Sequence, residues 1–375
     1  MKKIILIPDS FKGSLSSLQA ARVMERVIRR RYPECALFSM PMSDGGDGFL
    51  ACLLKTLPGK RITAEVTGPT GDPIPSAYGM LSDQTAVIEL ALASGLGLTR
   101  PGSDPGVTTT AGVGELIRHA VANGAKSIWI GLGGSATNDA GCGLADAMGI
   151  AFYTSDGTKF RPSGATLSMI DRIDLSRVPK AVVDVPFRLF TDVMNPLCGP
   201  EGASHVFAPQ KGADPRKVMT LETNMIAFAT LLRRRYDFRT DYPGAGAAGG
   251  AGVLLKCFFD VQIHQGIDAM LDLVGFDQKA IDADLVITGE GRLDQQTLQG
   301  KAIHGIAKRC HALSVPLVAF VGRSELNPDT YPAGLCRVVE ITPKSMPINQ
   351  ALSQASKLLE SALDRYLHQG VGSFQ

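Results

Sequence analysis

The sequence predicts an α/β protein with two domains, one of them a doubly wound domain assembled from both ends of the chain. Both chain ends alternate short apolar strands with amphipathic helices, whereas β-type alternation with turn dipeptides begins near Arg61. A chain of 375 residues with 45% hydrophobic residues can bury two cores. We therefore expect a discontinuous domain over residues 1–62 and 265–375, with an α/β domain inserted over residues 63–264.

The first two strands each lead into a polar loop. Residues 3–7 are apolar, and apolar side chains then recur every three or four residues up to Ile28, which predicts strand, loop and helix. A second strand is expected over residues 36–40, followed by the loop DGGDG. Asp44 and Asp47 of that loop suit a hard cation or base catalysis, since loops after the strands of open sheets bind ligands. An ordinary turn is the alternative.

The central stretch SIWIGLGGSATNDAGCGLA, residues 127–145, combines an apolar run with a knot of small residues. We expect a helix over 108–122, a strand over 128–130, a turn containing Gly133, Gly134 and Ser135, and a helix from Asn138 to Met148. Backbone N–H groups of such a turn suit a phosphate or carboxylate. A close-packed turn without a ligand is the alternative.

The same stretch satisfies a loose dinucleotide fingerprint, GxGxxA over residues 131–136 with Asp156 beyond it. The central position of the motif and a second glycine pair at 141 and 143 count against a nicotinamide site. Asp156 also precedes Gly157 in a turn dipeptide, where we expect a hairpin. A Walker-type loop around Lys301 lacks the required glycine and hydroxyl residues.

Two further polar segments follow in the next part of the chain. Asp192 and Asn195 come after a strand expected over 187–192 and suit a magnesium contact or a substrate hydroxyl, with a loop cap as the alternative. Lys211 is an anion candidate, with a solvated loop as the alternative. It precedes a helix that Asp214 caps, with Pro215 at its first position, up to about Arg235. The run GAGAAGGAG, residues 244–252, predicts a packed turn.

The closing third returns to strand and helix alternation. Strands are expected over 285–288, 316–321 and 337–341, and a final amphipathic helix over 349–367. Directly after the first of these strands, Glu290, Arg292 and Asp294 lie between glycines. Buried charges of both signs are costly unless they are paired or bound to a ligand, which favours a site here over a surface loop. Lys301 extends this polar edge and could reach a phosphate.

The composition limits the class of protein. Thirty-eight basic against 36 acidic residues argue against nucleic acid or a membrane surface as a partner. The seven cysteines are dispersed without a CxxC pair, which is typical of reduced thiols in a cytoplasmic protein. No apolar run is long enough for a signal peptide core or a membrane span. A homodimer is compatible with these observations.

Seven segments, in this order and spacing, resemble the bacterial glycerate kinase family of type 1 over nearly the whole chain: PDSFKGSLS, PMSDGGDG, IGLGGSATNDAG, DVMNPLCGPEGA, FAPQKGA, PGAGAAGG and ITGEGRLDQQTLQGKA. The resemblance implies a flavodoxin-like domain and a second, restriction-enzyme-like α/β domain. It also implies ATP-dependent, Mg²⁺-dependent phosphorylation of D-glycerate, usually to 2-phosphoglycerate. The 3-position or a related hydroxy acid is one alternative; a non-catalytic hydroxy-acid sensor and an NAD-dependent oxidoreductase are others.

The resemblance carries over to fifteen polar positions: Asp9, Ser10, Lys12, Asp44, Asp47, Ser135, Asn138, Asp139, Asp192, Asn195, Lys211, Glu290, Arg292, Asp294 and Lys301. Phosphoryl transfer needs cations, a magnesium site and a base. We expect Asp192 as base, with Asp44 second.

The remaining roles follow the same hypothesis. Catalysis would also involve Lys12 and Arg292, which would bind substrate together with Ser10 and Asn195. The nucleotide would be bound by Gly133, Gly134, Ser135, Asn138, Lys211 and Lys301. Magnesium would be bound by Asp47, Glu290 and Asp294. We expect the glycine loop to face the DGGDG and GEGRLD loops across the cleft between the two domains.

The chain departs from the family pattern at a few positions. Ala111 and Val113 replace a tyrosine and a threonine, Gln295 replaces a glycine, and Ile303 replaces a proline. Asp47 stands where glutamate is usual. These changes bear on the shape of the substrate pocket and leave the required charged groups in place.

Overall fold

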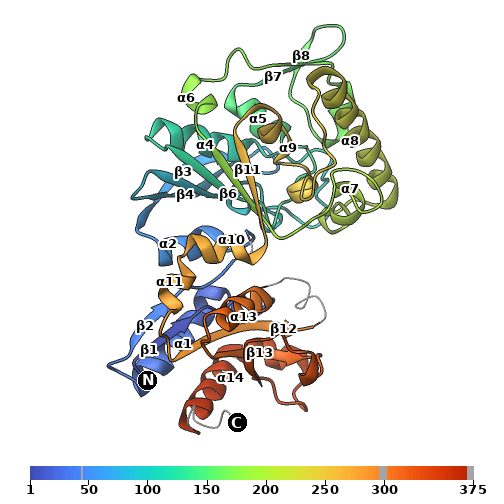
Figure 1. Ribbon diagram of the computed structural model, residues 1–375. Helices are drawn as coiled ribbons and strands as arrows, with labels where there is room; N and C mark the ends of the chain where they lie inside the picture. The colour runs from blue at the N-terminus through green and yellow to red at the C-terminus, as the bar shows by residue number, and fades with distance from the viewer. Residues whose placement is uncertain (44, 295–301, 370–375) are drawn as a thin grey trace. The chain divides into compact units, whose positions relative to one another are not determined.

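The computed structural model describes residues 1–43, 45–294 and 302–369, and the chain divides into two compact units (Figure 1). Unit 1 comprises Met1–Asp44, Ala51–Leu57 and Gly266–Gln375, and unit 2 comprises Gly45–Leu50 and Pro58–Gln265. Residue 62, the expected first boundary, lies inside strand β3 of unit 2. The segment 51–57 returns to unit 1 before the long insertion begins.

Unit 1 contains a five-stranded parallel sheet in the order β14-β13-β12-β1-β2. In chain order this arrangement is 2-1-3-4-5, the flavodoxin-like order, whose switch point lies between β1 and β12. Ligands bind at the carboxyl ends of the strands beside such a point. The strands are β1 (Lys3–Leu6), β2 (Ala36–Ser39), β12 (Leu285–Leu293), β13 (Leu317–Ser324) and β14 (Leu335–Glu340).

Helices cover both faces of this sheet, as its alternation of buried side chains requires. Ile4, Leu6, Ile287 and Phe320 form one core with α1 and α14, which pack against each other. The opposite face contacts α13. The helices are α1 (Ser17–Arg31), α2 (Phe49–Thr56), α10 (Gly266–Leu273), α11 (Phe276–Ala280), α13 (Ala302–Ala312) and α14 (Ile348–His368).

Unit 2 contains a six-stranded mixed sheet in the order β11-β10-β6-β5-β4-β3. The first four strands of this order are parallel, and β4 and β3 continue the sheet as an antiparallel pair. The strands are β3 (Gly59–Thr67), β4 (Pro73–Leu81), β5 (Thr85–Glu89), β6 (Ser127–Gly131), β10 (Phe187–Thr191) and β11 (Val261–Gln265). A small antiparallel sheet adds β7 (Ala151–Tyr153), β8 (Lys159–Phe160) and β9 (Arg172–Asp174).

The helices of unit 2 pack around its larger sheet. They are α3 (Ala91–Ser94), α4 (Ala111–Ala122), α5 (Cys142–Met148), α6 (Lys180–Val183), α7 (Ala203–Phe207), α8 (Pro215–Tyr236) and α9 (Val253–Phe258). The cap predicted for α8 is confirmed, since Asp214 Oδ1 accepts a hydrogen bond from Lys217 N at 2.8 Å. The predicted hairpin is confirmed as β7–β8, and residues 244–252 pack as a turn.

Two predicted boundaries are wrong. The polar cluster expected after a strand over 285–288 lies within β12, which continues to Leu293 because it stays paired with β13 as far as Ser324. The helix expected from Asn138 begins only at Cys142. Ala140 and Gly141 adopt positive φ angles there, so the backbone turns before the helix starts.

Within residues 1–43, 45–294 and 302–369, none of the helices combines the length and apolar character needed to cross a bilayer.

The core of unit 1 can be tested on α14. Leu363 is fully buried, whereas Ile348 on the same helix is 57% exposed. L363A should lower the free energy of unfolding by about 2–5 kcal/mol, because it removes buried methyl groups and leaves a cavity. I348A, its control, should change stability by no more than about 0.5 kcal/mol. Urea unfolding measures both, and equal effects would contradict this packing.

Candidate active-site residues

The first group of candidate residues lies in unit 1, at the carboxyl ends of β1 and β12. The chain leaving β1 stays bonded to β12, with Ile7 N donating to Ile287 O at 2.8 Å and Asp9 N to Gly289 O at 2.9 Å. Ser10 N donates to the Asp9 carboxylate at 2.6 Å. The switch point of the sheet therefore carries the polar loop that begins at Asp9.

Lys12 lies in this loop beside β12. A Cβ added to Gly291 would lie 3.1 Å from Lys12 N, so the glycine lets the loop approach the strand closely. The Lys12 side chain is exposed, and Glu290 of the adjoining strand is buried. The sheet thus brings together Ser10, Lys12 and Glu290, which are distant in sequence.

Arg292 belongs to an ion-pair network on the same edge. Its guanidinium contacts Glu325 at 2.5 Å and Asp294 at 3.7 Å, and its side chain is 62% exposed. The Glu325 carboxylate is the main cause of a raised pKa for Arg292. Glu325 was not predicted from the sequence, because its proximity to Arg292 depends on the β12–β13 pairing. Arg292 would have to share its charge with these carboxylates when binding an anion.

The second group lies in unit 2, where the glycine loop after β6 packs against residues 45–47. Gly133 N donates to Gly45 O at 2.8 Å, and a Cβ added to Gly133 would lie 2.3 Å from Gly46 Cα. A Cβ added to Gly134 would lie 2.7 Å from Asp47 Oδ1. These two glycine-rich segments, predicted separately as ligand loops, are in direct contact.

Lys211 is buried beneath this loop instead of being solvated. Its ammonium donates to Ser135 Oγ at 2.8 Å and to Thr137 O at 2.7 Å. Burial lowers the pKa of Lys211 to about 7, while the charge of Asp139 opposes that shift. The structure therefore brings the predicted nucleotide-binding residues Lys211 and Ser135 together.

Asp139 organises the rest of the loop from a fully buried position. Its carboxylate accepts hydrogen bonds from Thr110 N and Oγ1 at 2.9 and 2.8 Å and from the N–H groups of Gly141 and Gly143 at 3.2 Å. Burial raises the pKa of Asp139, and these hydrogen bonds oppose that shift. They hold the turn that delays α5 until Cys142.

Asn138 is also fully buried. Its amide donates to Ser204 Oγ of α7 at 3.2 Å, whereas its Oδ1 has no hydrogen-bond partner among the described residues. In this conformation Asn138 links the loop to α7 and presents no surface to solvent.

Glu89 adjoins the candidate site and was not among the residues predicted from the sequence. It ends β5, is 5% exposed, and accepts hydrogen bonds from Gly48 N at 3.0 Å and Leu50 N at 3.1 Å. Burial raises the pKa of Glu89, and the nearby charge of Asp47 adds to the increase. A lone acid closing the apolar run TAVIEL was the available signal. Glu89 anchors the segment that carries Asp47.

Asp192 and Asn195 follow β10, the strand beside β6 in the sheet. Asp192 is exposed. The Asn195 side-chain amide donates to Glu201 O at 2.7 Å, and the Asn195 backbone carbonyl accepts a hydrogen bond from Gly246 N at 2.9 Å. Asn195 therefore shapes the loop after β10, while Asp192 remains accessible to solvent.

Asp44 and Lys301 lie outside the described residues. Among the described residues, no group of three or more histidine, cysteine, aspartate or glutamate side chains is arranged to hold a metal ion.

The dinucleotide-binding alternative relies on Asp156 as its acidic residue. Asp156 lies in the β7–β8 turn, where its carboxylate accepts hydrogen bonds from Thr158 N at 3.0 Å and from Thr154 Oγ1. The two strands that this turn joins belong to the small antiparallel sheet and do not extend the sheet that contains β6. Asp156 is thus occupied as a turn residue.

Comparisons with known proteins agree over almost the whole length. The family model described as the glycerate kinase family matches residues 4–369. A glycerate kinase of Bacillus subtilis is 40% identical, over 96% of this chain and 95% of its own. A glycerate 2-kinase of Escherichia coli K12 is 38% identical over 85% of each chain. A crystal structure described as glycerate kinase 2 from Salmonella typhimurium LT2 superimposes with a TM-score of 0.85 at 37% identity, covering 98% of both chains.

The contact between the two glycine segments is testable with one methyl group. G133A forces the backbone of residues 45–46 aside and should lower the free energy of unfolding by about 1–3 kcal/mol. The control is G97A, because a Cβ at Gly97 meets nothing within 4 Å. Chemical unfolding compares the two variants, and a G133A variant as stable as G97A would show that the segments are not packed this closely.

The burial of Lys211 predicts a pH-dependent stability. Since its folded pKa of about 7 lies below the ordinary value of 10.5, the unfolded chain binds more protons between these two pH values. Lys211 should therefore make stability rise with pH in that window, by up to about 1.4 kcal/mol per pH unit. K211M should lack this contribution, and K126M, which replaces an exposed lysine, should retain it. Parallel pH profiles for wild type and K211M, from chemical unfolding, would refute the burial of a titrating amine.

Proposed function

Since the chain belongs to the glycerate kinase family, we propose that it transfers the γ-phosphoryl group of ATP to the 2-hydroxyl of D-glycerate. The extent of the family match, residues 4–369, carries the proposal. The name glycerate 2-kinase of the Escherichia coli relative favours the 2-position. We further propose that the enzyme requires Mg²⁺ and acts in the cytoplasm.

We assign nucleotide phosphates to the glycine loop of unit 2. The ammonium of Lys211 lies directly beneath Ser135, and Gly133 and Gly134 let residues 45–47 pack closely against the loop. A phosphate near the loop would favour the charged form of Lys211, since burial of that ammonium is costly without a nearby anion. The ordered packing against residues 45–47 supports a preformed loop, which loses little entropy on binding.

We assign Asp192 as the base for the attacking hydroxyl, with Asp44 as second choice. The hydroxyl proton passes to the carboxylate as the new O–P bond forms, the bond between the β–γ bridging oxygen and the γ-phosphorus breaks, and ADP leaves with the electron pair. The exposure of Asp192 at the end of β10 supports this role, because a base must reach the substrate.

In unit 1 we assign Ser10, Lys12 and Arg292 to the carboxylate of glycerate or to the transferring group. Lys12 supplies a flexible point charge, and Arg292 supplies a planar fork suited to a carboxylate or phosphate. Their position at the switch point of the flavodoxin-like sheet supports a ligand-binding role. Asn195 and Lys301 complete the proposed substrate and nucleotide contacts.

The candidate ligands for Mg²⁺ are Asp47, Glu290 and Asp294. Mg²⁺ commonly uses one or two carboxylates together with substrate phosphates, so a cage of protein side chains is not required. Asp47 fits this pattern, because its carboxylate lies beside Gly134 in the proposed phosphate loop. When bound, the ion would neutralise charge on the phosphates.

The direct test is ADP formation from ATP with D-glycerate, followed by phosphorus NMR of the product to locate the phosphorylated carbon. The 2-phosphate is expected. Formation of the 3-phosphate would correct the position alone, whereas ligand-induced stabilisation without turnover would favour the sensor alternative and reject the kinase.

The role of Asp192 predicts that its substitution lowers turnover without weakening ATP binding. D192N should lower kcat about 100-fold or more, because it removes the base, while the dissociation constant for ATP should stay within about twofold, a difference of less than 0.5 kcal/mol. D184N, which changes an exposed aspartate in the same unit, should turn over like wild type. If D192N and D184N have the same kcat, Asp192 is not the base.

A further inference from the structure

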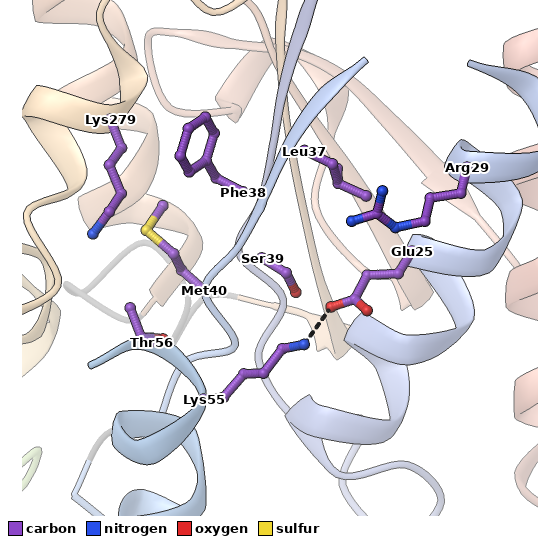
Figure 2. A pocket seen from close by; sticks show the side chains of 9 residues that line it. All are labelled: Glu25, Arg29, Leu37, Phe38, Ser39, Met40, Lys55, Thr56 and Lys279. Carbon is purple, nitrogen blue, oxygen red and sulfur yellow. Dashed lines mark ion pairs between the residues drawn. The ribbon is translucent and has the colours of Figure 1, made fainter. Parts of the chain in front are cut away.

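A pocket of about 250 Å³ lies in unit 1, away from the candidate residues at β1 and β12 (Figure 2). It opens beside β2, the edge strand of the sheet, and α1, α2 and α11 contribute side chains to it. Neither Lys12 nor Arg292 lines it. The polar lining residues are Glu25, Arg29, Ser39, Lys55, Thr56 and Lys279.

Cations dominate this pocket. Figure 2 shows Arg29 and Lys55 near Glu25, the single carboxylate among the described lining residues, and Lys279 on the other side of β2, where its ammonium donates to Val274 O. Glu25 forms an ion pair with Lys55 at 3.1 Å, which leaves two positive charges in excess. Cations that line one pocket repel one another unless an anion or solvent screens them.

The Arg29 guanidinium is the key donor. Among residues 1–43, 45–294 and 302–369, no hydrogen-bond acceptor or carboxylate pairs with it, whereas Arg30 next to it pairs with Glu360 and Asp364 of α14. An arginine fork binds a phosphate or carboxylate through two parallel hydrogen bonds. Arg29 is therefore available for an anion in the pocket.

The edge of β2 adds neutral donors. Ala36 N and Met40 N donate to Lys2 O and Leu6 O on the β1 side. Because successive residues of a strand point their N–H groups to opposite sides, Ser39 N faces the open edge. The Ser39 hydroxyl is shielded from solvent and has no hydrogen-bond partner in the described part of the chain. A buried unsatisfied hydroxyl is costly, so a ligand that approaches closely enough to accept a hydrogen bond from it would be stabilised.

The size of the pocket limits the ligand. Drug-sized ligands usually occupy about 300–1,000 Å³, so this pocket suits a smaller species. Half-burial of Lys279 lowers its pKa, and a bound anion would offset the cost of keeping that ammonium charged.

We propose that this pocket is an anion-binding site for a phosphate group, either free inorganic phosphate or the phosphate of a small phosphorylated acid. The group accepts hydrogen bonds from Arg29 and from the Ser39 edge, and Lys55 and Lys279 balance its charge. The site is independent of the proposed phosphoryl transfer.

The test measures the melting temperature of the full chain against inorganic phosphate, with ionic strength held constant by NaCl. Wild type should be stabilised in a saturable manner, which gives an apparent dissociation constant. R29Q should raise that constant about tenfold, the cost expected for losing hydrogen bonds to a charged group. R22Q removes an exposed arginine of α1 outside the pocket and should leave the constant unchanged.

A second variant, expected to change phosphate affinity in the opposite direction, provides the test if R29Q folds poorly. E25Q removes the only carboxylate among the described residues that line the pocket and should strengthen phosphate binding. No stabilisation of wild type by either inorganic phosphate or 3-phosphoglycerate, equal constants for R29Q and R22Q with both probes, or weaker binding by E25Q would overturn the proposal.

A parallel titration with 3-phosphoglycerate distinguishes the two sources of the phosphate. Phosphate binding elsewhere on the chain should be the same in all three variants, so a difference between their apparent dissociation constants reports on this pocket. If Arg29 affects both probes alike, the pocket recognises the phosphate group itself; if Arg29 affects only 3-phosphoglycerate, the ligand is a phosphorylated acid. Independence of both probes from Arg29 would reject the site.

Discussion

The buried carboxylate of Asp139 is the interaction on which the organisation of unit 2 depends. It joins the start of α4 to the start of α5 through hydrogen bonds from Thr110, Gly141 and Gly143. Its charge also favours the ammonium of Lys211, which would otherwise be isolated in the interior. Burial of an ammonium is costly, and the charge of Asp139 offsets part of that cost. The hydrogen bonds that these two side chains form fix the backbone of the glycine loop.

Local rules predicted much of the fold. Apolar spacing located β1, α1 and α14, and the cap at Asp214 located α8, since these signals depend on neighbours in sequence. The extension of β12 to Leu293 could not be predicted in the same way, because pairing with β13 determines it. The late start of α5 likewise depends on a carboxylate that captures amides which a helix would otherwise use.

The same contrast between local signals and distant contacts applies to the candidate residues. The strand exits identified the loops at Lys12, Gly133 and Asp192, because glycine and acidic residues after an apolar run leave a clear pattern. That pattern does not predict which side chains are buried. The structure rejects the solvated-loop alternative for Lys211, and Asn138 has no exposed surface. Glu89 and Glu325 enter through contacts between distant segments, so no local signal identified their partners.

The discontinuous sheet of unit 1 has a consequence for synthesis. Its interior strand β1 needs β12 beside it, and the hydrogen bond from Thr288 to Ile7 joins residues 281 positions apart. On the ribosome, β1 and β2 therefore emerge long before their partner, while most of unit 2 is continuous in sequence and can close first. An unpaired apolar strand invites wrong pairing. Nascent chains of this topology should depend on holding chaperones until the last third has been made.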